Sequence, residues 1–403
     1  MPIDFAAKKA LFHLPEGVIY LDGNSLGPMV KTAPAAVDRA VQAEWGEMLI
    51  RGWNGPEKRG AGWMAQPVVL GNCVGRLIGA EPGTVVLGDT LSIKVYQALA
   101  SALEMNPKRR VILSDSGNFP SDLYMAEGLC RTLGGQYRLK TVAPEEAMAA
   151  IDETTAVVML TEVDYRTGRR HHMADITARA HDMGAITVWD LAHSAGAIPV
   201  DLAGAKADFA VGCTYKYLNS GPGGPAFIYV APRHADMVRP ALSGWLGHAA
   251  PFAFDLDYRP GAGIERMRVG TPSVLQMAAL EAAMAVWDDV GMDEVHAQSL
   301  RLQDQFIKAV EARTRGLTLA TPRSHQMRGS QVSFRHPEGY AIMQALIAEG
   351  VIGDFRAPDI LRFGFTPLYL DEDDVARAVN VLVRILEYAT WDKPEFRARS
   401  LVT

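Results

Sequence analysis

The chain has 403 residues, of which 48% are hydrophobic and 21% charged, and its formal net charge is −6. This length exceeds one ordinary hydrophobic core, so we expect two domains in a compact unit. A net negative charge without a basic block argues against a nucleic-acid partner. No apolar run approaches about 20 residues, so we expect no membrane-spanning segment.

The N-terminal stretch and the cysteines lead us to expect a cytoplasmic protein. The N-terminal stretch has an early acid and no apolar core, unlike a secretory signal. Cys73, Cys130 and Cys213 lie far apart and form no CxxC pair, so we expect reduced, structural thiols.

The first residues are predicted to form an arm. A short extended piece runs into the turn LDGNSLG at 21–27, and helical spacing follows from Pro34 to Leu49. We assign residues 1–45 to an N-terminal arm that contributes to the small domain, 46–291 to a large ligand-binding domain and 292–403 to a small C-terminal domain.

The middle of the chain alternates between strand and helix patterns. Strands are predicted at 110–115, 156–163, 185–189, 210–214 and 226–230, with helices at 122–132 and 175–183. This alternation is typical of βαβ units, so the predicted fold class is α/β with a mostly parallel central sheet. The short glycine-rich link between the last two strands favours an antiparallel pair there.

Two helix starts are also predicted. Asp89-Thr-Leu-Ser-Ile-Lys94 carries good capping residues, and its free N–H groups could bind a phosphate, although most such caps only begin helices. Thr271-Pro272 is predicted to begin a long helix, with Thr as the cap and Pro at the first helical position.

Ionisable residues follow two buried-type strands. Asp190 and His193 come after the first strand, and Tyr215 and Lys216 after the second. Ligands bind at the carboxyl edge of open α/β sheets. A buried lysine without a partner is costly, whereas a Schiff base to pyridoxal phosphate (PLP) removes that cost, and Asp190 would pair with the pyridinium nitrogen. The alternatives are a surface lysine, a helix-capping aspartate and a core histidine.

Further candidates lie outside these two strands. Phe119 could stack on a cofactor ring, with a plain turn as the alternative. Arg362 could hold a substrate carboxylate in a two-bond fork or serve as an ordinary ion-pair partner. His171-His172 has no third ligand at a suitable spacing, so we expect solvent-exposed histidines and no metal site.

The sequence resembles the kynureninase family, PLP-dependent enzymes of the aspartate-aminotransferase fold (fold type I), over nearly its whole length. The motifs that carry the resemblance are LDGNSLG, NFPSD, WDLAHSAG, CTYKYLNSGPGG, SGWLGH and RFGFTPLY. The strongest pair is DLAH followed by YKYLN.

This resemblance implies a set of site residues. Lys216, Tyr215 and Asp190 would be catalytic. The cofactor would contact Leu91, Ser92, Phe119, Pro120, Ser121, Asp122, Thr161, Asp190, His193, Tyr215, Lys216, Trp245 and Thr271. The substrate would contact Arg362, Ser25, Trp53 and Gly270. Trp245 and Thr271 match positions that reach the cofactor from the second subunit, which implies a homodimer with a shared active site.

The resemblance also implies a reaction, the hydrolysis of L-kynurenine to anthranilate and L-alanine in tryptophan catabolism and pyridine nucleotide biosynthesis. Animal members have His and Ser-Asn where this chain has Trp53 and Gly270-Thr271, which implies a bacterial type that prefers kynurenine to 3-hydroxykynurenine. The alternatives are a class V aminotransferase, another PLP lyase or a non-catalytic PLP-fold binding protein. A desulfurase needs a cysteine in the C-terminal half, and the last cysteine here is Cys213.

Overall fold

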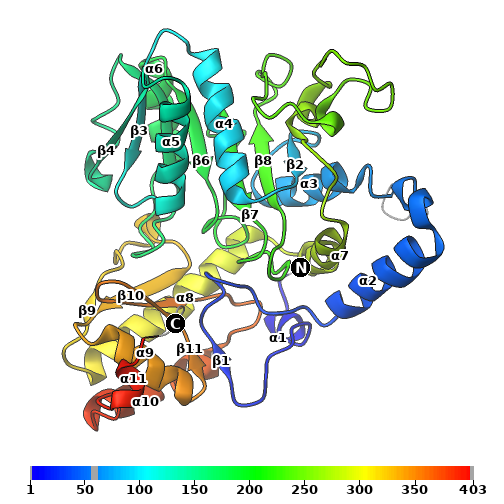
Figure 1. The fold of residues 1–403 in the computed structure, drawn as a ribbon. Helices are drawn as coiled ribbons and strands as arrows, with labels where there is room; N and C mark the ends of the chain where they lie inside the picture. Colours follow the sequence, from blue (N-terminus) through cyan, green and yellow to red (C-terminus); the bar gives the residue numbers. More distant parts are fainter. Residues whose placement is uncertain (1, 56–61, 400–403) are drawn as a thin grey trace.

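The structure is a computed structural model and describes residues 2–55 and 62–399. A large sheet with its helices forms one part of the molecule, and a smaller sheet with the last helices forms the other (Figure 1). Among the described residues, no helix is both long and apolar enough to cross a bilayer.

The large sheet has seven strands in the order β2-β8-β7-β6-β5-β3-β4. Their bounds are β2 Val85–Leu87, β3 Val111–Asp115, β4 Arg138–Val142, β5 Thr155–Thr161, β6 Ile186–Asp190, β7 Phe209–Cys213 and β8 Ala226–Val230. The pairs from β4 through β7 are parallel, whereas β8 pairs antiparallel with both β7 and β2. The predicted mostly parallel sheet with an antiparallel end is confirmed.

Helices cover both faces of this sheet, which explains why its central strands are apolar throughout. The helices are α3 Gln66–Leu77, α4 Leu91–Met105, α5 Pro120–Thr132, α6 Met173–Asp182 and α7 Val274–Met284. α4 begins directly after Thr90, as predicted. The predicted start at Thr271 is wrong, because residues 271–273 have no regular secondary structure and Ser273 takes the N-cap position of α7.

The small sheet has four antiparallel strands in the order β12-β13-β10-β9. The bounds of these strands and of the helices around them are β9 Thr318–Leu319, β10 Gln331–Arg335, β12 Asp354–Arg356, β13 Ile360–Gly364, α8 Met292–Arg313, α9 Gly339–Ala348, α10 Glu372–Glu387 and α11 Pro394–Arg397. α10 begins with a capping box in which Asp371 and Asp374 each accept the other's backbone N–H.

The N-terminal arm joins the two parts. The arm contains helices α1 Phe5–Lys9 and α2 Ala33–Arg39 and, between them, the short strand β1 Ile19–Tyr20. This strand pairs in parallel with β11 Val351–Ile352. The turn that follows reaches the large sheet, where the Gly27 N–H donates to the Tyr215 carbonyl at 2.8 Å. A Cβ at Gly27 would lie 2.2 Å from the Lys216 carbonyl oxygen, so only glycine permits this approach.

Candidate active site

A cavity of about 170 Å³ lies where strands β5, β6 and β7 end. It brings together many of the residues that the sequence singled out, namely Ser25, Leu91, Phe119, Thr161, Asp190, His193, Tyr215, Lys216 and Arg362. Residues that no sequence argument singled out also line it, namely Asn24, Tyr165, Ala192 and Arg356.

Lys216 projects into this cavity from the loop after β7. Hydrogen bonds of Thr214 hold this loop in place, because Thr214 Oγ1 donates to the Pro225 carbonyl at 2.6 Å and lies 2.7 Å from Ser220 Oγ. Lys216 Nζ lies 3.0 Å from His193 Nε2. Burial, together with the charge of Lys216, holds the pKa of His193 well below its usual value. His193 is therefore neutral, and its Nε2 can accept a hydrogen bond from the Lys216 amine.

Asp190 is a buried carboxyl group that lines another end of the cavity, and the buried Asp122 carboxyl group lies near it. Asp190 is the last residue of β6, and its Oδ1 accepts the Ala192 N–H at 2.9 Å. Burial raises the pKa of Asp190 to about 6, although the Lys216 charge opposes the shift. Burial and the neighbouring Asp190 raise the pKa of Asp122 well above its usual value. Asp122 Oδ2 is buried and has no hydrogen-bond partner among the described residues. This end can accept a cationic N–H donor.

The N-termini of α4 and α5 meet beside the cavity. Ser92 Oγ in the first turn of α4 lies 3.0 Å from Ser121 Oγ in the first turn of α5. Pro120 is the first residue of α5, and Leu91 begins α4 and lines the cavity. Two helix N-termini offer free backbone N–H groups and the positive ends of two dipoles, so a phosphate fits here.

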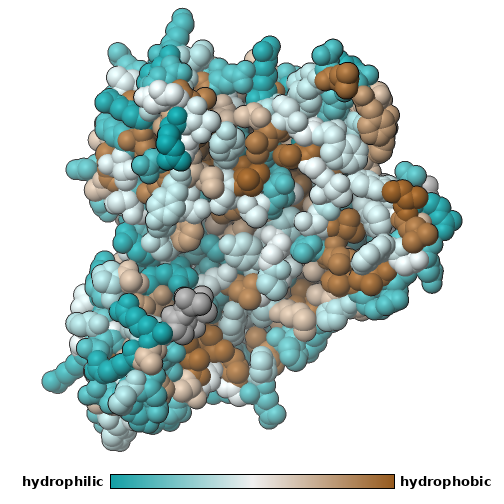
Figure 2. Space-filling view, in the orientation of Figure 1, coloured by the Kyte–Doolittle hydropathy of each residue, from teal (hydrophilic) through white to brown (hydrophobic). Residues whose placement is uncertain are grey.

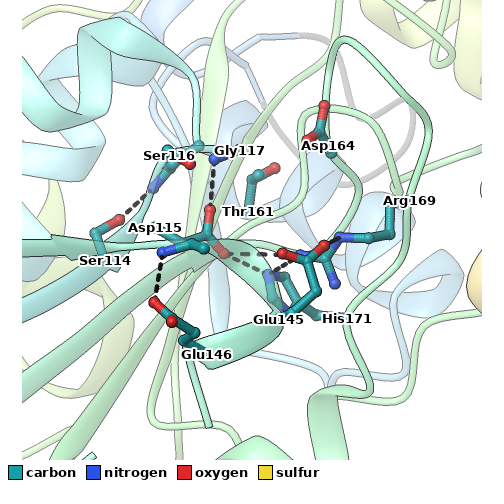
Figure 3. A network of polar contacts seen from close by, with 12 residues as sticks. Ser114, Asp115, Ser116, Gly117, Glu145, Glu146, Thr161, Asp164, Arg169 and His171 are labelled. Carbon is teal, nitrogen blue, oxygen red and sulfur yellow. Dashed lines mark hydrogen bonds and ion pairs between the residues drawn. The ribbon is translucent and has the colours of Figure 1, made fainter. Parts of the chain in front are cut away.

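A buried polar network supports the turn that carries Phe119 (Figure 3). His171 Nε2 lies 2.6 Å from Asp115 Oδ2 and 3.0 Å from the Arg169 guanidinium. The other oxygen of Asp115 accepts the Gly117 N–H at 2.8 Å. The prediction of two exposed histidines is therefore wrong for His171, because a carboxylate distant in sequence buries and satisfies it.

A further part of the cavity contains two arginines, Arg356 and Arg362. Arg362 comes from β13 and is buried, with its guanidinium hydrogen-bonded to Asp354, to Ser25 Oγ at 2.8 Å and to the Tyr165 carbonyl at 2.6 Å. Arg356, the last residue of β12, lies on the neighbouring strand and also lines the cavity. This end is suited to an anionic group.

Some predicted site residues do not line this cavity. Trp53 packs edge-to-face against Trp245, with ring centroids 5.8 Å apart, and neither ring is among the lining residues. Gly270 and Thr271 are exposed on the segment before α7. Within one chain, the structure therefore leaves these four residues away from Lys216.

Comparison with known proteins places the sequence in a family. Residues 295–382 match the kynureninase C-terminal domain. Kynureninases from Pseudomonas fluorescens and from Burkholderia pseudomallei strain K96243 are each 50% identical to this chain over 399 residues, which cover 97% of this chain and 95% of theirs. The chain belongs to the kynureninase family.

Solved structures agree with the fold. An apo cysteine desulfurase from Thermococcus onnurineus superimposes with a TM-score of 0.79 at 19% identity, covering 96% of this chain and 99% of that one. An Escherichia coli cysteine desulfurase gives a TM-score of 0.78 at 18% identity and the same coverage. The predicted PLP-dependent fold type I is confirmed, with a mostly parallel central sheet.

The residues that sequence reasoning missed had weak signals of their own. Arg356 precedes Ala357-Pro358, which could be taken as the turn of a hairpin over residues 351–365. That hairpin would place residue 354 opposite Arg362 and Arg356 on the neighbouring strand. Tyr165 follows β5 in the stretch VDYRTG, where nothing marks an aromatic ring as a cavity residue. Its ring packs edge-to-face on Phe119, with centroids 5.2 Å apart. Even with the kynureninase motifs recognised, neither residue stands in a motif that carried the resemblance.

Proposed function

We propose that this chain is a kynureninase that hydrolyses L-kynurenine to anthranilate and L-alanine with PLP as its cofactor. The observation that carries the proposal is the 50% identity to kynureninases over 97% of the chain. The cavity supports it, because a lysine, a buried carboxyl group and a buried arginine from distant parts of the sequence line one space.

The residues present fit PLP. The unpartnered Asp122 oxygen and the raised pKa of Asp190 mark a carboxyl end that a pyridinium N–H would satisfy. The paired helix starts at Ser92 and Ser121 suit a phosphate. In a structural neighbour, a mutant of the cystine C–S lyase C-DES, glycine is covalently linked to the PLP cofactor. Phe119 and Thr161 would flank the ring.

When bound, PLP supplies an aldehyde for the substrate amine and a ring that withdraws electrons. Lys216 Nζ takes the proton from the substrate Cα and is oriented by His193. Asp190 keeps a negative charge at the deep end of the site and thereby favours the protonated ring nitrogen. Arg362 holds the substrate carboxylate, and Ser25 accepts a hydrogen bond from the Arg362 guanidinium and helps to orient it.

Water then adds to the aryl ketone of the substrate, and the Cβ–Cγ bond breaks to release anthranilate. The Cβ that remains takes a proton, and L-alanine leaves. The Cys213 thiol and burial raise the pKa of Tyr215, so its phenol stays protonated at neutral pH and is able to donate that proton.

We further propose a homodimer in which Trp53, Trp245, Gly270 and Thr271 contact the partner's site. Large apolar side chains are exposed on the segment after α2 and on the loop after Trp245, namely Trp45, Leu49, Ile50, Phe252, Phe254 and Leu256. Figure 2 shows apolar surface gathered on the projecting segment around α2. Such exposure is typical of an interface.

We propose further that Trp53 and Gly270-Thr271 favour kynurenine over 3-hydroxykynurenine as the substrate. We also propose that the enzyme acts in the cytoplasm, in tryptophan catabolism.

The test mixes the purified protein with PLP and L-kynurenine and follows anthranilate fluorescence and alanine release. We expect the two products in equal amounts, with no requirement for a 2-oxo acid. Turnover only in the presence of a 2-oxo acid would identify an aminotransferase instead. A protein that acquires no PLP absorbance would be a non-catalytic member of the fold.

A further inference from the structure

The substrate end of the cavity holds two guanidinium groups on adjacent strands. Asp354 on β12 lies opposite Arg362 on β13, and Arg356 lies two residues after Asp354. The Arg362 side chain is 2% exposed, whereas the Arg356 side chain is 35% exposed and lines the same cavity. The two arginines thus differ in how freely they meet a ligand.

Most of the hydrogen-bonding capacity of Arg362 is already used. Its Nε donates to Asp354 Oδ1 at 2.7 Å, and its NH2 donates to Asp354 Oδ2 and to Ser25 Oγ. Its NH1 donates to the Tyr165 carbonyl at 2.6 Å. A guanidinium carries five N–H donors, so one remains. Arg362 cannot form a two-bond fork with a substrate carboxylate unless it gives up one of these contacts.

Arg356 retains more free donors. Its NH2 lies 2.7 Å from Asp354 Oδ2 and donates to Ser25 Oγ at 3.3 Å, and its NH1 donates to the Phe355 carbonyl at 3.2 Å. Among the described residues, no hydrogen bond is formed by its Nε–H or by the second N–H of NH1. These donors are available to a ligand in the cavity.

The local charge leaves room for one more anion. Two carboxyl groups face the two arginines, and one of them, Asp354, is paired with both. The other is Asp22 on the N-terminal arm, whose pKa burial and the Asp354 charge raise to about 7. Near neutral pH, Asp22 is therefore partly protonated, and the cluster carries more positive than negative charge. A substrate carboxylate would neutralise the remaining positive charge of this cluster.

We propose that Arg356 binds the α-carboxylate of the substrate together with Arg362, each supplying part of the contact while Asp354 and Ser25 hold both guanidinium groups in place. This proposal rests on the proposed function and deepens it. In it, Arg362 gives its one remaining N–H from the floor of the cavity. Arg356, the more exposed of the two arginines, donates its free N–H groups to the substrate carboxylate.

The main test compares Arg356→Gln with the unchanged holoenzyme. A carboxylate contact that is kept throughout the reaction lowers KM without changing kcat. We therefore expect the KM for L-kynurenine to rise by about 10- to 100-fold, the size of a lost charge-assisted contact, and kcat to stay within about threefold. Arg356→Lys, which keeps the charge but loses the planar fork, should give an intermediate KM. Arg335→Gln in the same sheet, where exposed Arg335 pairs with Asp359 at 3.1 Å, is the matched control and should leave KM unchanged.

A carboxylate-free ligand separates a binding role from a packing role. The decarboxylated analogue of L-kynurenine should inhibit Arg356→Gln and the unchanged enzyme with the same inhibition constant, within about twofold. A parallel loss of affinity for this analogue, or an unchanged KM for L-kynurenine, would overturn the proposal.

A titration with L-alanine, followed by the absorbance of the bound cofactor, distinguishes the two hypotheses. If the unchanged protein does not release anthranilate, the proposed function fails, and weaker L-alanine binding by Arg356→Gln would still support the carboxylate contact. If turnover is intact and both proteins bind L-alanine equally, the role of Arg356 is wrong.

Discussion

Asp190 and Asp208 lie at opposite edges of the large sheet, and their exposed fractions are nearly the same, 2% and 3%. Asp190 ends β6 at the carboxyl edge, whereas Asp208 immediately precedes β7 at the amino edge. Their acidities are shifted in opposite directions. Burial raises the pKa of Asp190 to about 6, whereas hydrogen bonds hold the pKa of Asp208 far below its usual value.

The difference comes from the donors around each carboxyl group. Asp208 is approached by His181 and His234 at 2.8 Å each and by Arg233 at 2.6 Å, and it accepts the backbone N–H of Thr187 at 2.8 Å. These contacts outweigh the cost of burial.

Around Asp190 the protein provides fewer donors. The Ala192 N–H is bonded to it, and the nearby Asp122 has an unpartnered oxygen. The Asp208 carboxylate at the amino edge is therefore satisfied within the polypeptide, whereas the carboxyl edge carries an unsatisfied carboxyl oxygen that a bound cofactor would satisfy.

The largest effect is expected from Lys216→Ala at the carboxyl edge. Removing the base that takes the Cα proton should lower kcat by about a thousandfold or more. Because Lys216 contributes little to the hydrophobic core, the unfolding temperature should change little. Anthranilate release and thermal unfolding measure the two effects, with exposed Lys308→Ala as the control. Full turnover by cofactor-bound Lys216→Ala would refute the proposed chemistry.

At the amino edge, Asp208→Asn should reduce stability without changing the chemistry. An amide places donors against the donors of His181, Arg233 and Thr187, so we expect a loss of about 3 kcal/mol in the free energy of unfolding. Denaturant titration measures this loss, and kcat should be unchanged. Since the folded pKa of Asp208 is lowered, its contribution is present above the unfolded pKa near 3.8 and is lost as the pH falls below that value. A loss that does not shrink in acid would contradict the assignment.

Asp190→Asn should have the opposite effect on the stability of the cofactor-free protein. The unfolded pKa is 3.8 and the folded pKa is about 6, so the unfolded chain loses its proton first as the pH rises. The unsubstituted protein therefore loses stability between these values, and the amide does not.

We expect the cofactor-free variant to be more stable than the unsubstituted protein at pH 7 by on the order of 1–3 kcal/mol, and no more stable near pH 4. Unfolding curves at the two pH values measure the difference. The variant should also lose most of its activity. Equal stabilities at pH 7 would show that Asp190 is better satisfied than the structure indicates.

The smallest effect is expected from Tyr217→Phe. The Tyr217 hydroxyl is buried near the site and has no hydrogen-bond partner in the part of the chain that the structure describes. Its removal should leave stability unchanged or increase it by up to about 1 kcal/mol. The matched change at the amino edge is Thr187→Val, which removes a hydroxyl that lies 3.0 Å from Asp208 Oδ2 and should cost about 1–2 kcal/mol. Thermal unfolding of both variants compares the two edges directly, and equal costs would remove the contrast between them.

Much of the fold could be predicted from the sequence because its central strands are apolar on both faces. Strand β4 was missed, since Arg138–Val142 lies at the sheet edge with charged, partly exposed side chains. Asp190 and Lys216 could be predicted because Asp190 ends one buried strand and Lys216 comes three residues after the end of the next.

The remaining parts of the site depend on tertiary contacts that no local pattern encodes. His171 is buried by Asp115, which lies 56 residues earlier in the chain. Arg356 becomes a candidate only once Arg362 is seen to be engaged by Asp354. Trp53 and Trp245 lie away from the cavity, and their proposed roles require a second chain.

The pairing of β1 with β11 determines when the site is completed during synthesis. Ile19 pairs with Val351, so the strand that leads to Asp22 and Ser25 has no partner on the ribosome until almost the whole chain has emerged. Long-range pairs of this kind form late, because closing the intervening loop must come first. The large sheet, with Asp190 and Lys216, is synthesised well before that point. The nascent chain could therefore capture its cofactor before it is able to hold a substrate.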